Sequence, residues 1–170
     1  MNISDEVIFD ILLNSNIHDI KNLCQTDNQF NRLCHDKHFW IIKFNQDQLP
    51  FTDGPNYIDV YINAMVNKLV FYIKNQPFQY IHFTIPLTIL IEIDPKTFSL
   101  VKEDFNEKIE EFIGIAYNQY NNTWTIDTYG NRTRVINEDL VISYLQYIIY
   151  HGGNIYLNKI GISTHYLNFI

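Results

Sequence analysis

The chain of 170 residues has few of the features that mark a nucleic-acid-binding, membrane or secreted protein. It has no run of five basic residues, and its formal net charge is −7. A nucleic-acid-binding protein would show a basic face, so we expect no nucleic-acid partner. Its apolar runs are too short to cross a membrane, and its polar, acidic N-terminus is unlike a signal peptide. We therefore expect an intracellular protein, cytoplasmic or nuclear, with no membrane partner.

Motifs for catalysis and for cofactor binding are also missing. The sequence has no phosphate-binding glycine loop, no HExxH and no CxxC. The best metal candidate combines Cys24 and Cys34 with His35 and His38, but structural zinc sites show clearer paired spacing. A nucleophilic Cys34 is disfavoured because neighbours on a helix, such as His35, do not face each other. We expect both cysteines to be small core residues. We also expect no enzyme, no catalytic residue, no metal and no cofactor.

Apolar and aromatic residues are plentiful. Hydrophobic residues make up 46% of the chain and aromatic residues 15%, which is ample for a core. The segment 48–55 contains two prolines, a glycine and an aspartate, and therefore predicts a loop. We expect a helical module over residues 1–48 and a separate domain over residues 56–170.

Capping, charge and periodicity together predict a first helix after Ser4. Ser4 can accept a hydrogen bond from a free amide, and Asp5 and Glu6 follow where the helix dipole favours negative charge. Apolar residues then recur at helical spacing, on a stripe wider than one buried face needs. The surplus suggests a partner, although packing against the rest of the chain would explain it equally well. The stripe consists of Val7, Ile8, Ile11 and Leu12, widened by Phe9 and Leu13.

Further short helices are expected before residue 48. Apolar residues recur at helical spacing from Ile17 to Cys24, and Thr26 with Gln29 has the form of a capping box. Asp36 can cap a last helix, whose apolar residues are Phe39, Trp40 and Phe44. Short helices bury little surface alone, so such a module normally packs on a partner or on the next domain.

The segment from Ile3 to Phe30 carries a recognisable pattern. It begins Ile3-Ser4-Asp5-Glu6, continues with three apolar residues and Ile11-Leu12, and leads into a second apolar helix. This arrangement resembles an F-box, the module that docks substrate receptors onto a cullin-type ubiquitin ligase. The match needs no gap, but Ser4 stands where the family has Pro, and Phe30 replaces its central Trp. A chance helical hairpin with similar spacing is the alternative.

The resemblance implies an adaptor that binds a Skp-family protein and, through it, a cullin. The rest of the chain would then select an unknown target protein. Heavy use of Asn, Ile and Tyr is typical of AT-rich coding sequence, and large AT-rich DNA viruses and intracellular pathogens are known to encode F-box proteins. A viral or pathogen origin is therefore compatible with the resemblance. The expected partner-binding residues are Ile3, Glu6, Val7, Ile8, Ile11, Leu12, Ile20 and Leu23.

Residues 56–170 predict an α+β fold, with a small, mostly antiparallel sheet and packed helices. A helix is expected over 56–75, ended by Pro77, and a second is capped by Asn137 and ended by Gly152. A charged helix or turn is expected over 102–111, and a hairpin turn over 129–131. Strands are expected at 80–85, 87–93, 112–117, 124–128, 134–136 and 155–157.

The predicted hairpin loops offer a surface for target binding. We expect Tyr117, Tyr120, Tyr129 and Arg132 to bind the target, because Tyr and Arg often dominate the energy of protein interfaces. Loops held by a rigid sheet are where recognition usually occurs. The alternative is that the tyrosines simply cover the sheet around Trp124, which would then be a core residue.

Two functions therefore remain open, and a small enzyme is a third, weaker alternative. The chain is either an F-box-like adaptor or a structural or interaction protein whose N-terminal helices pack on its own core. Exposure of Ile8, Phe9, Leu12 and Leu13 would favour the adaptor. An enzyme would need a polar pocket with convergent titratable groups.

Overall fold

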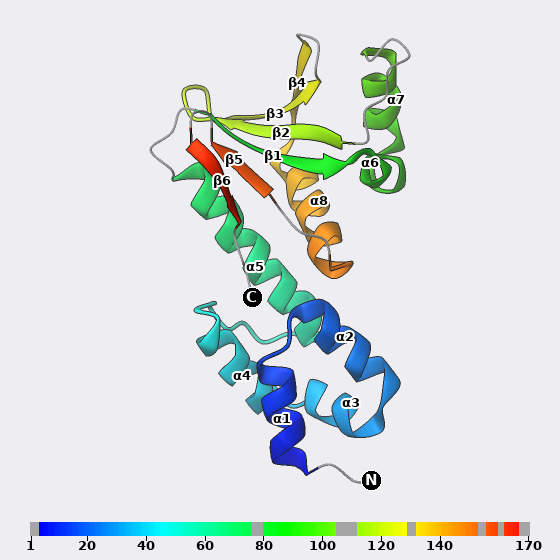
Figure 1. Ribbon diagram of the computed structural model, residues 1–170, viewed down its shortest axis with the longest axis vertical. Helices are drawn as coiled ribbons and strands as arrows, with labels where there is room; N and C mark the ends of the chain where they lie inside the picture. The colour runs from blue at the N-terminus through cyan, green and yellow to red at the C-terminus, as the bar shows by residue number, and fades with distance from the viewer. Residues whose placement is uncertain are drawn as a thin grey trace. The chain divides into compact units, whose positions relative to one another are not determined.

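Helices occupy the first part of the chain and an antiparallel sheet with further helices occupies the second, which confirms the predicted α+β class. The computed structural model describes residues 4–75, 80–104, 112–128, 132–152, 156–159 and 162–166 (Figure 1). Contacts divide the chain into two units. The helical unit holds residues 1–68 with 149–153, and the sheet unit holds residues 69–148 with 154–168.

The helical unit contains four short helices and the start of a longer one. These are α1 (Asp5–Leu13), α2 (Ile17–Thr26), α3 (Asn28–Cys34), α4 (Lys37–Gln46) and α5 (Tyr57–Lys74). Asp36 caps α4 as predicted, because its carboxylate accepts a hydrogen bond from the amide of His38 at 2.8 Å. Ser4 is the N-cap residue of α1, but its side chain accepts no such bond.

The capping box predicted from Thr26 is wrong. The Thr26 hydroxyl instead donates to the carbonyl of Leu23, and thus belongs to the end of α2. Asp27 caps α3, because its carboxylate accepts from the amide of Gln29 at 2.7 Å. Asp27 caps α3 in place of Thr26 because its side-chain oxygen is suitably placed and carries a negative charge, which the start of a helix favours.

Trp40 is the centre of the helical core. Its ring is fully buried, and its indole N–H donates to the carbonyl of Cys34 at 2.7 Å. The rings of Tyr57 and Tyr61, from the start of α5, lie 6.2 and 5.7 Å from it. This packing explains why the division between the units falls within α5, after Lys68, rather than in the loop at 48–55.

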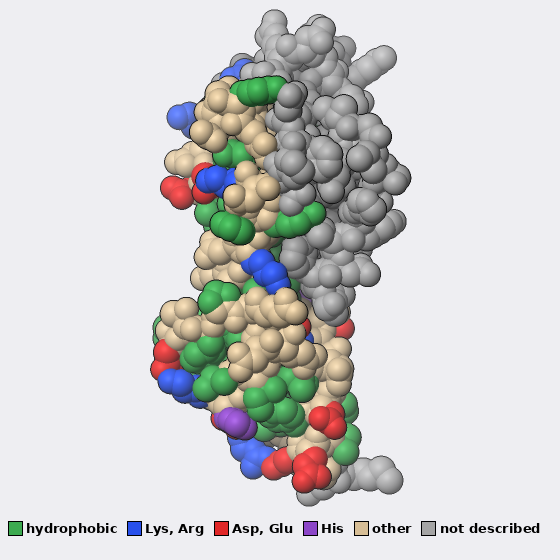
Figure 2. Space-filling view, turned by 90° about the vertical axis from the view of Figure 1, so that its left-hand side faces the viewer, with side chains coloured by type: hydrophobic (Ala, Val, Ile, Leu, Met, Phe, Trp, Pro, Cys, Tyr) green, Lys and Arg blue, Asp and Glu red, His purple; other side chains and the backbone are tan. Residues whose placement is uncertain are grey.

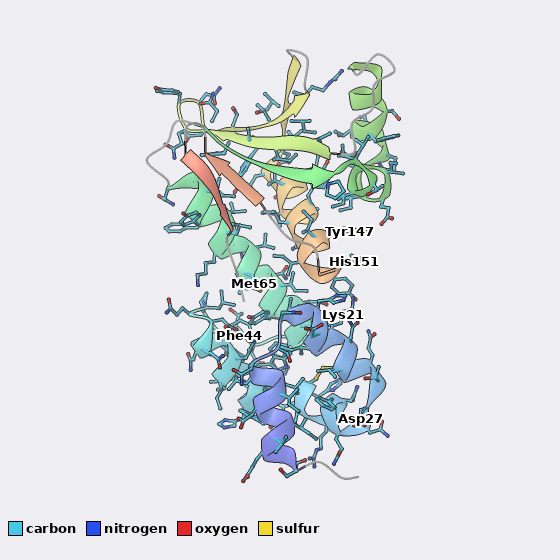
Figure 3. The ribbon with its side chains drawn as sticks, viewed as in Figure 1. Lys21, Asp27, Phe44, Met65, Tyr147 and His151 are labelled. Carbon is cyan, nitrogen blue, oxygen red and sulfur yellow. A yellow bond between two sulfur atoms is a disulfide. The ribbon has the colours of Figure 1, made fainter. Side chains whose placement is uncertain are left out.

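A disulfide joins Cys24 on α2 to Cys34 on α3 (Figure 3). The sequence interpretation treated both cysteines as separate core residues; both are buried, but they are paired. The hairpin of α2 and α3 places their Cα atoms 6.1 Å apart, which is within the range that a disulfide spans. The bond therefore staples two consecutive helices of the helical unit.

Lys43 on α4 is a buried charged residue in the helical core, with 4% of its surface exposed. Its ammonium donates to the carbonyls of Leu13 at 2.9 Å and Ser15 at 3.1 Å, at and just after the end of α1. It also forms an ion pair with Asp47, one turn further along α4, at 3.2 Å. A helix end leaves carbonyl oxygens without internal partners, and Lys43 supplies donors for them.

The sheet unit is built on six antiparallel strands in the order β4-β3-β2-β1-β5-β6 (Figure 1). Their bounds are β1 (Tyr80–Pro86), β2 (Phe112–Asn118), β3 (Thr123–Thr128), β4 (Arg132–Ile136), β5 (Tyr156–Lys159) and β6 (Ile162–Tyr166). Ile115 of β2 pairs with Ile126 of β3, and both are fully buried. Consecutive residues of β2 from Ile113 to Tyr117 are all buried, so both faces of this strand are covered.

Helix α8 (Glu138–Tyr150) covers one face of the sheet (Figure 1). Asn137 caps it as predicted, by accepting a hydrogen bond from the amide of Asp139. Its buried residues Tyr144 and Leu145 complete the core. At its end Gly152 has a φ of +72°, which is the left-handed conformation expected of a glycine after a helix.

The strand predicted at 87–93 is wrong, because this segment is helix α6 (Leu87–Ile93). Leu87, Ile89 and Leu90 are buried, whereas Ile91 is 47% exposed. A short apolar run fits a buried strand and a buried helix equally well, so the sequence did not separate them. Pro86 ends β1 and is the N-cap residue of α6.

Helix α7 (Pro95–Asp104) overlaps the expected charged helix or turn only over 102–104. Residues 105–111 and the predicted hairpin turn at 129–131 lie outside the described residues. The strand expected at 155–157 begins at Tyr156 as β5, and β6 lies in a segment for which the sequence predicted no element.

We expect Lys43→Met to destabilise the helical unit by about 2–3 kcal/mol, because it leaves partly buried carbonyls and Asp47 without their cation. Urea unfolding, followed by hydrogen exchange of the α1 and α4 amides, measures the loss. Lys37→Met is the matched control, since Lys37 is exposed in its ion pair with Asp53. Equal stability of the two variants would contradict the role assigned to Lys43.

We expect the sheet unit to lose stability in acid partly through Glu138. Hydrogen bonds from Lys74 and from the Trp124 indole lower the pKa of this carboxyl below its ordinary value of 4.5. A lowered pKa adds stability that is present above the ordinary value and is lost as the pH falls through the lowered one. Glu138→Gln should therefore reduce the drop in urea midpoint between about pH 7 and about pH 3. An unchanged drop would show that the pair contributes nothing.

Candidate partner-binding surface

Helix α1 divides its apolar residues between the core and the surface. Ile8 and Leu12 are fully buried, whereas Val7 is 49% and Ile11 40% exposed. Each pair has the four-residue spacing that places side chains on one face of a helix. The wide apolar stripe of the sequence is thus two stripes, and only Val7 and Ile11 face solvent.

Three of the residues that the F-box resemblance assigned to a partner belong to the core of the helical unit. Ile8, Leu12 and Ile20 are 0% exposed, which corrects their assignment as contact residues. They were included because sequence periodicity identifies an apolar face but not what covers it. Leu23 is half-buried, and Ile3 lies outside the described residues.

The four residues chosen to distinguish the two functions are not solvent-facing as a group. Ile8 and Leu12 are buried, whereas Phe9 and Leu13 are half-buried. The Phe9 ring packs edge-on against Phe39 at 5.5 Å between centroids. This result favours packing of α1 on its own unit for these residues and leaves Val7 and Ile11 as the apolar surface of the helix.

Carboxylates lie beside the exposed apolar stripe. Glu6 and Asp10 are exposed and spaced four apart, so they form a second stripe next to Val7 and Ile11. Figure 2 shows a face of the helical unit on which hydrophobic side chains gather in patches, with acidic side chains at the end where α1 begins.

A pocket of about 290 Å³ lies on the other side of these carboxylates, between α1 and α3. Phe9 and Leu33 form its apolar part, and Asp5 forms an ion pair with Arg32 at its edge. The complete lining is Asp5, Glu6, Phe9, Asp10 and Leu33.

The residues expected to bind a target are not brought together as a surface. Tyr117 is 3% exposed, its ring lies 4.8 Å from that of Trp124, and its hydroxyl donates to the side chain of Asn122. Tyr117 is therefore a core residue, and its assignment to the target site is corrected. Tyr120 is 74% exposed in the turn after β2. Tyr129 lies outside the described residues, and only the backbone of Arg132 is described, in β4.

The described part of the chain contains no cluster of three metal-ligating side chains. Cys24 and Cys34 are joined to each other, and His35 forms a hydrogen bond to the carbonyl of Asn31 at 2.8 Å. Within the described ranges, no helix is both long enough and apolar enough to cross a membrane.

Comparisons with known proteins add no assignment. No protein-family model matches the chain, and neither a characterised protein sequence nor a solved structure is significantly similar to it.

We expect Tyr120→Ala to leave the melting temperature unchanged and Tyr117→Ala to lower it. Tyr120 is largely solvated, whereas truncating a buried aromatic ring costs about 3–5 kcal/mol. Thermal denaturation followed by circular dichroism compares the two variants directly. Equal melting temperatures would contradict the assignment of Tyr117 to the core.

Proposed function

We propose that this protein is a non-enzymatic, F-box-like adaptor that docks a Skp-family protein through the exposed side of α1. The observation that supports this best is the solvent exposure of Val7 and Ile11 on a helix that the resemblance already identifies as the docking helix. The sheet unit would then contact a target protein. Of the four residues expected to bind a target, Tyr120 is the one whose side chain is described and exposed to solvent.

The division of α1 into two stripes is consistent with this role. Ile8 and Leu12 hold the helix on its own core, so a partner could bind Val7 and Ile11 without unfolding the unit. Truncation of either exposed residue would then affect binding rather than stability. A single exposed aliphatic residue needs no explanation, but two on one face of a short helix give a contact that can be tested.

A second function is a structural or interaction protein without a ligase role. Burial of Ile8, Leu12 and Ile20 within the unit favours it, because the apolar pattern then has an internal explanation. The Cys24–Cys34 disulfide favours it too. Disulfides persist mainly in oxidising compartments, whereas a ubiquitin-ligase adaptor would work in a reducing one.

We expect the double variant Val7→Asp/Ile11→Asp to bind a purified Skp-family protein at least about tenfold more weakly than the original chain. A charge on each exposed position would have to be desolvated in an apolar contact, although it costs the free protein little. Binding of the full-length chain, measured by calorimetry with and without a thiol reductant, gives the result.

Ile91→Asp is the matched control, because Ile91 is an equally exposed aliphatic residue on α6 in the sheet unit. It should bind as the original chain does. If the folded original chain binds no Skp-family protein, both with and without the reductant, the adaptor proposal is overturned. Equal weakening by the control would show that the α1 surface is not the docking site.

A further inference from the structure

We propose that the pocket between α1 and α3 receives a lysine or arginine side chain of a partner protein, held by the carboxylates of Glu6 and Asp10. The pocket lies across the carboxylates from Val7 and Ile11, so the proposal goes beyond docking on that stripe, although the F-box resemblance also assigned Glu6 to a partner. It identifies the partner by its chemistry, which is a lysine or arginine side chain exposed on its surface.

The inner part of the pocket suits the stem of a long side chain. The Phe9 ring is held in place by its edge-on contact with Phe39, and Leu33 is 9% exposed on the facing helix. The methylene groups of lysine and arginine pack on such apolar surface while the charged group stays at the rim. A volume of about 290 Å³ lies at the small end of ligand pockets, which suits one side chain better than a cofactor.

The rim supplies the charge that a basic side chain needs. Asp5 is already paired with Arg32, but the carboxylates of Glu6 and Asp10 have no hydrogen-bond or ion-pair partner among the described residues. Like charges spaced four apart on a helix repel each other modestly, and a cation placed beside them removes that repulsion.

A protein-borne cation fits better than a metal ion. The described residues hold no group of three metal-ligating side chains, and two of the five residues that line the pocket are aliphatic or aromatic. A hydrated divalent ion gains nothing from Phe9 and Leu33, whereas a lysine or arginine stem does. Charge and apolar lining together therefore select a lysine or arginine side chain of a partner protein.

The test uses a synthetic amphipathic helical peptide of leucine and lysine, titrated into the isotopically labelled full chain. We expect saturable changes in the NMR amide shifts of Phe9, Asp10 and Leu33. The double variant Glu6→Gln/Asp10→Asn should bind the peptide roughly fivefold more weakly, because it loses two charge pairs that are partly exposed to solvent. Added salt should reduce the peptide affinity of the original chain more than that of this variant.

Glu92→Gln/Asp139→Asn is the control, because it removes the same two charges from the sheet unit. It should leave the peptide affinity unchanged. Equal weakening in the two double variants would show general attraction to an acidic protein and would overturn the proposal. It would also be overturned by shift changes confined to residues outside the pocket.

Discussion

The buried ammonium of Lys43 is the interaction on which the arrangement of the helical unit depends. It joins the carbonyls after α1 to Asp47 at the end of α4. Asp47 in turn accepts from the hydroxyl of Tyr61, and its carbonyl accepts from Lys68, both on α5. Burial and the bond to Asp47 raise the pKa of Tyr61, so the phenol remains a donor. Lys43 thus joins the end of α1 to α4, and Asp47 continues the connection to α5. Together with the burial of Ile8 and Leu12, this contact holds α1 with Val7 and Ile11 toward solvent.

Local signals predicted most of the helices but not this connection. Asp36 caps an amide only two residues further along the chain, so this cap could be identified from the local sequence. Lys43 contacts carbonyls about thirty residues earlier in the chain, at a position set only by how α1 packs on α4. Lysine is rarely buried, so its burial could not be inferred from residue type. The same holds for the Cys24–Cys34 pair, which depends on the hairpin of α2 and α3.

The remaining errors arose where one pattern fits two packings. The apolar run at 87–93 is short enough for a strand or for a helix. The structure shows a helix, α6, with Leu87, Ile89 and Leu90 buried. The stripe of α1 combined two faces, because sequence shows that Ile8 and Ile11 are both apolar but not that only Ile8 is covered. Tyr117 was judged by residue type, yet its place on β2, one of the two central strands, put it in the core.

The exposed side of α1 is itself amphipathic, and this restricts what could bind there. Val7 and Ile11 form one stripe, Glu6 and Asp10 the next, and the pocket containing Phe9 follows. A purely apolar partner would cover the first stripe but would desolvate the neighbouring carboxylates without compensation. A purely basic partner would neutralise the carboxylates but would gain little from the aliphatic surface. A segment with apolar residues on one face and basic residues beside them satisfies both stripes at once, so the two proposed contacts belong together chemically even though each can be tested alone.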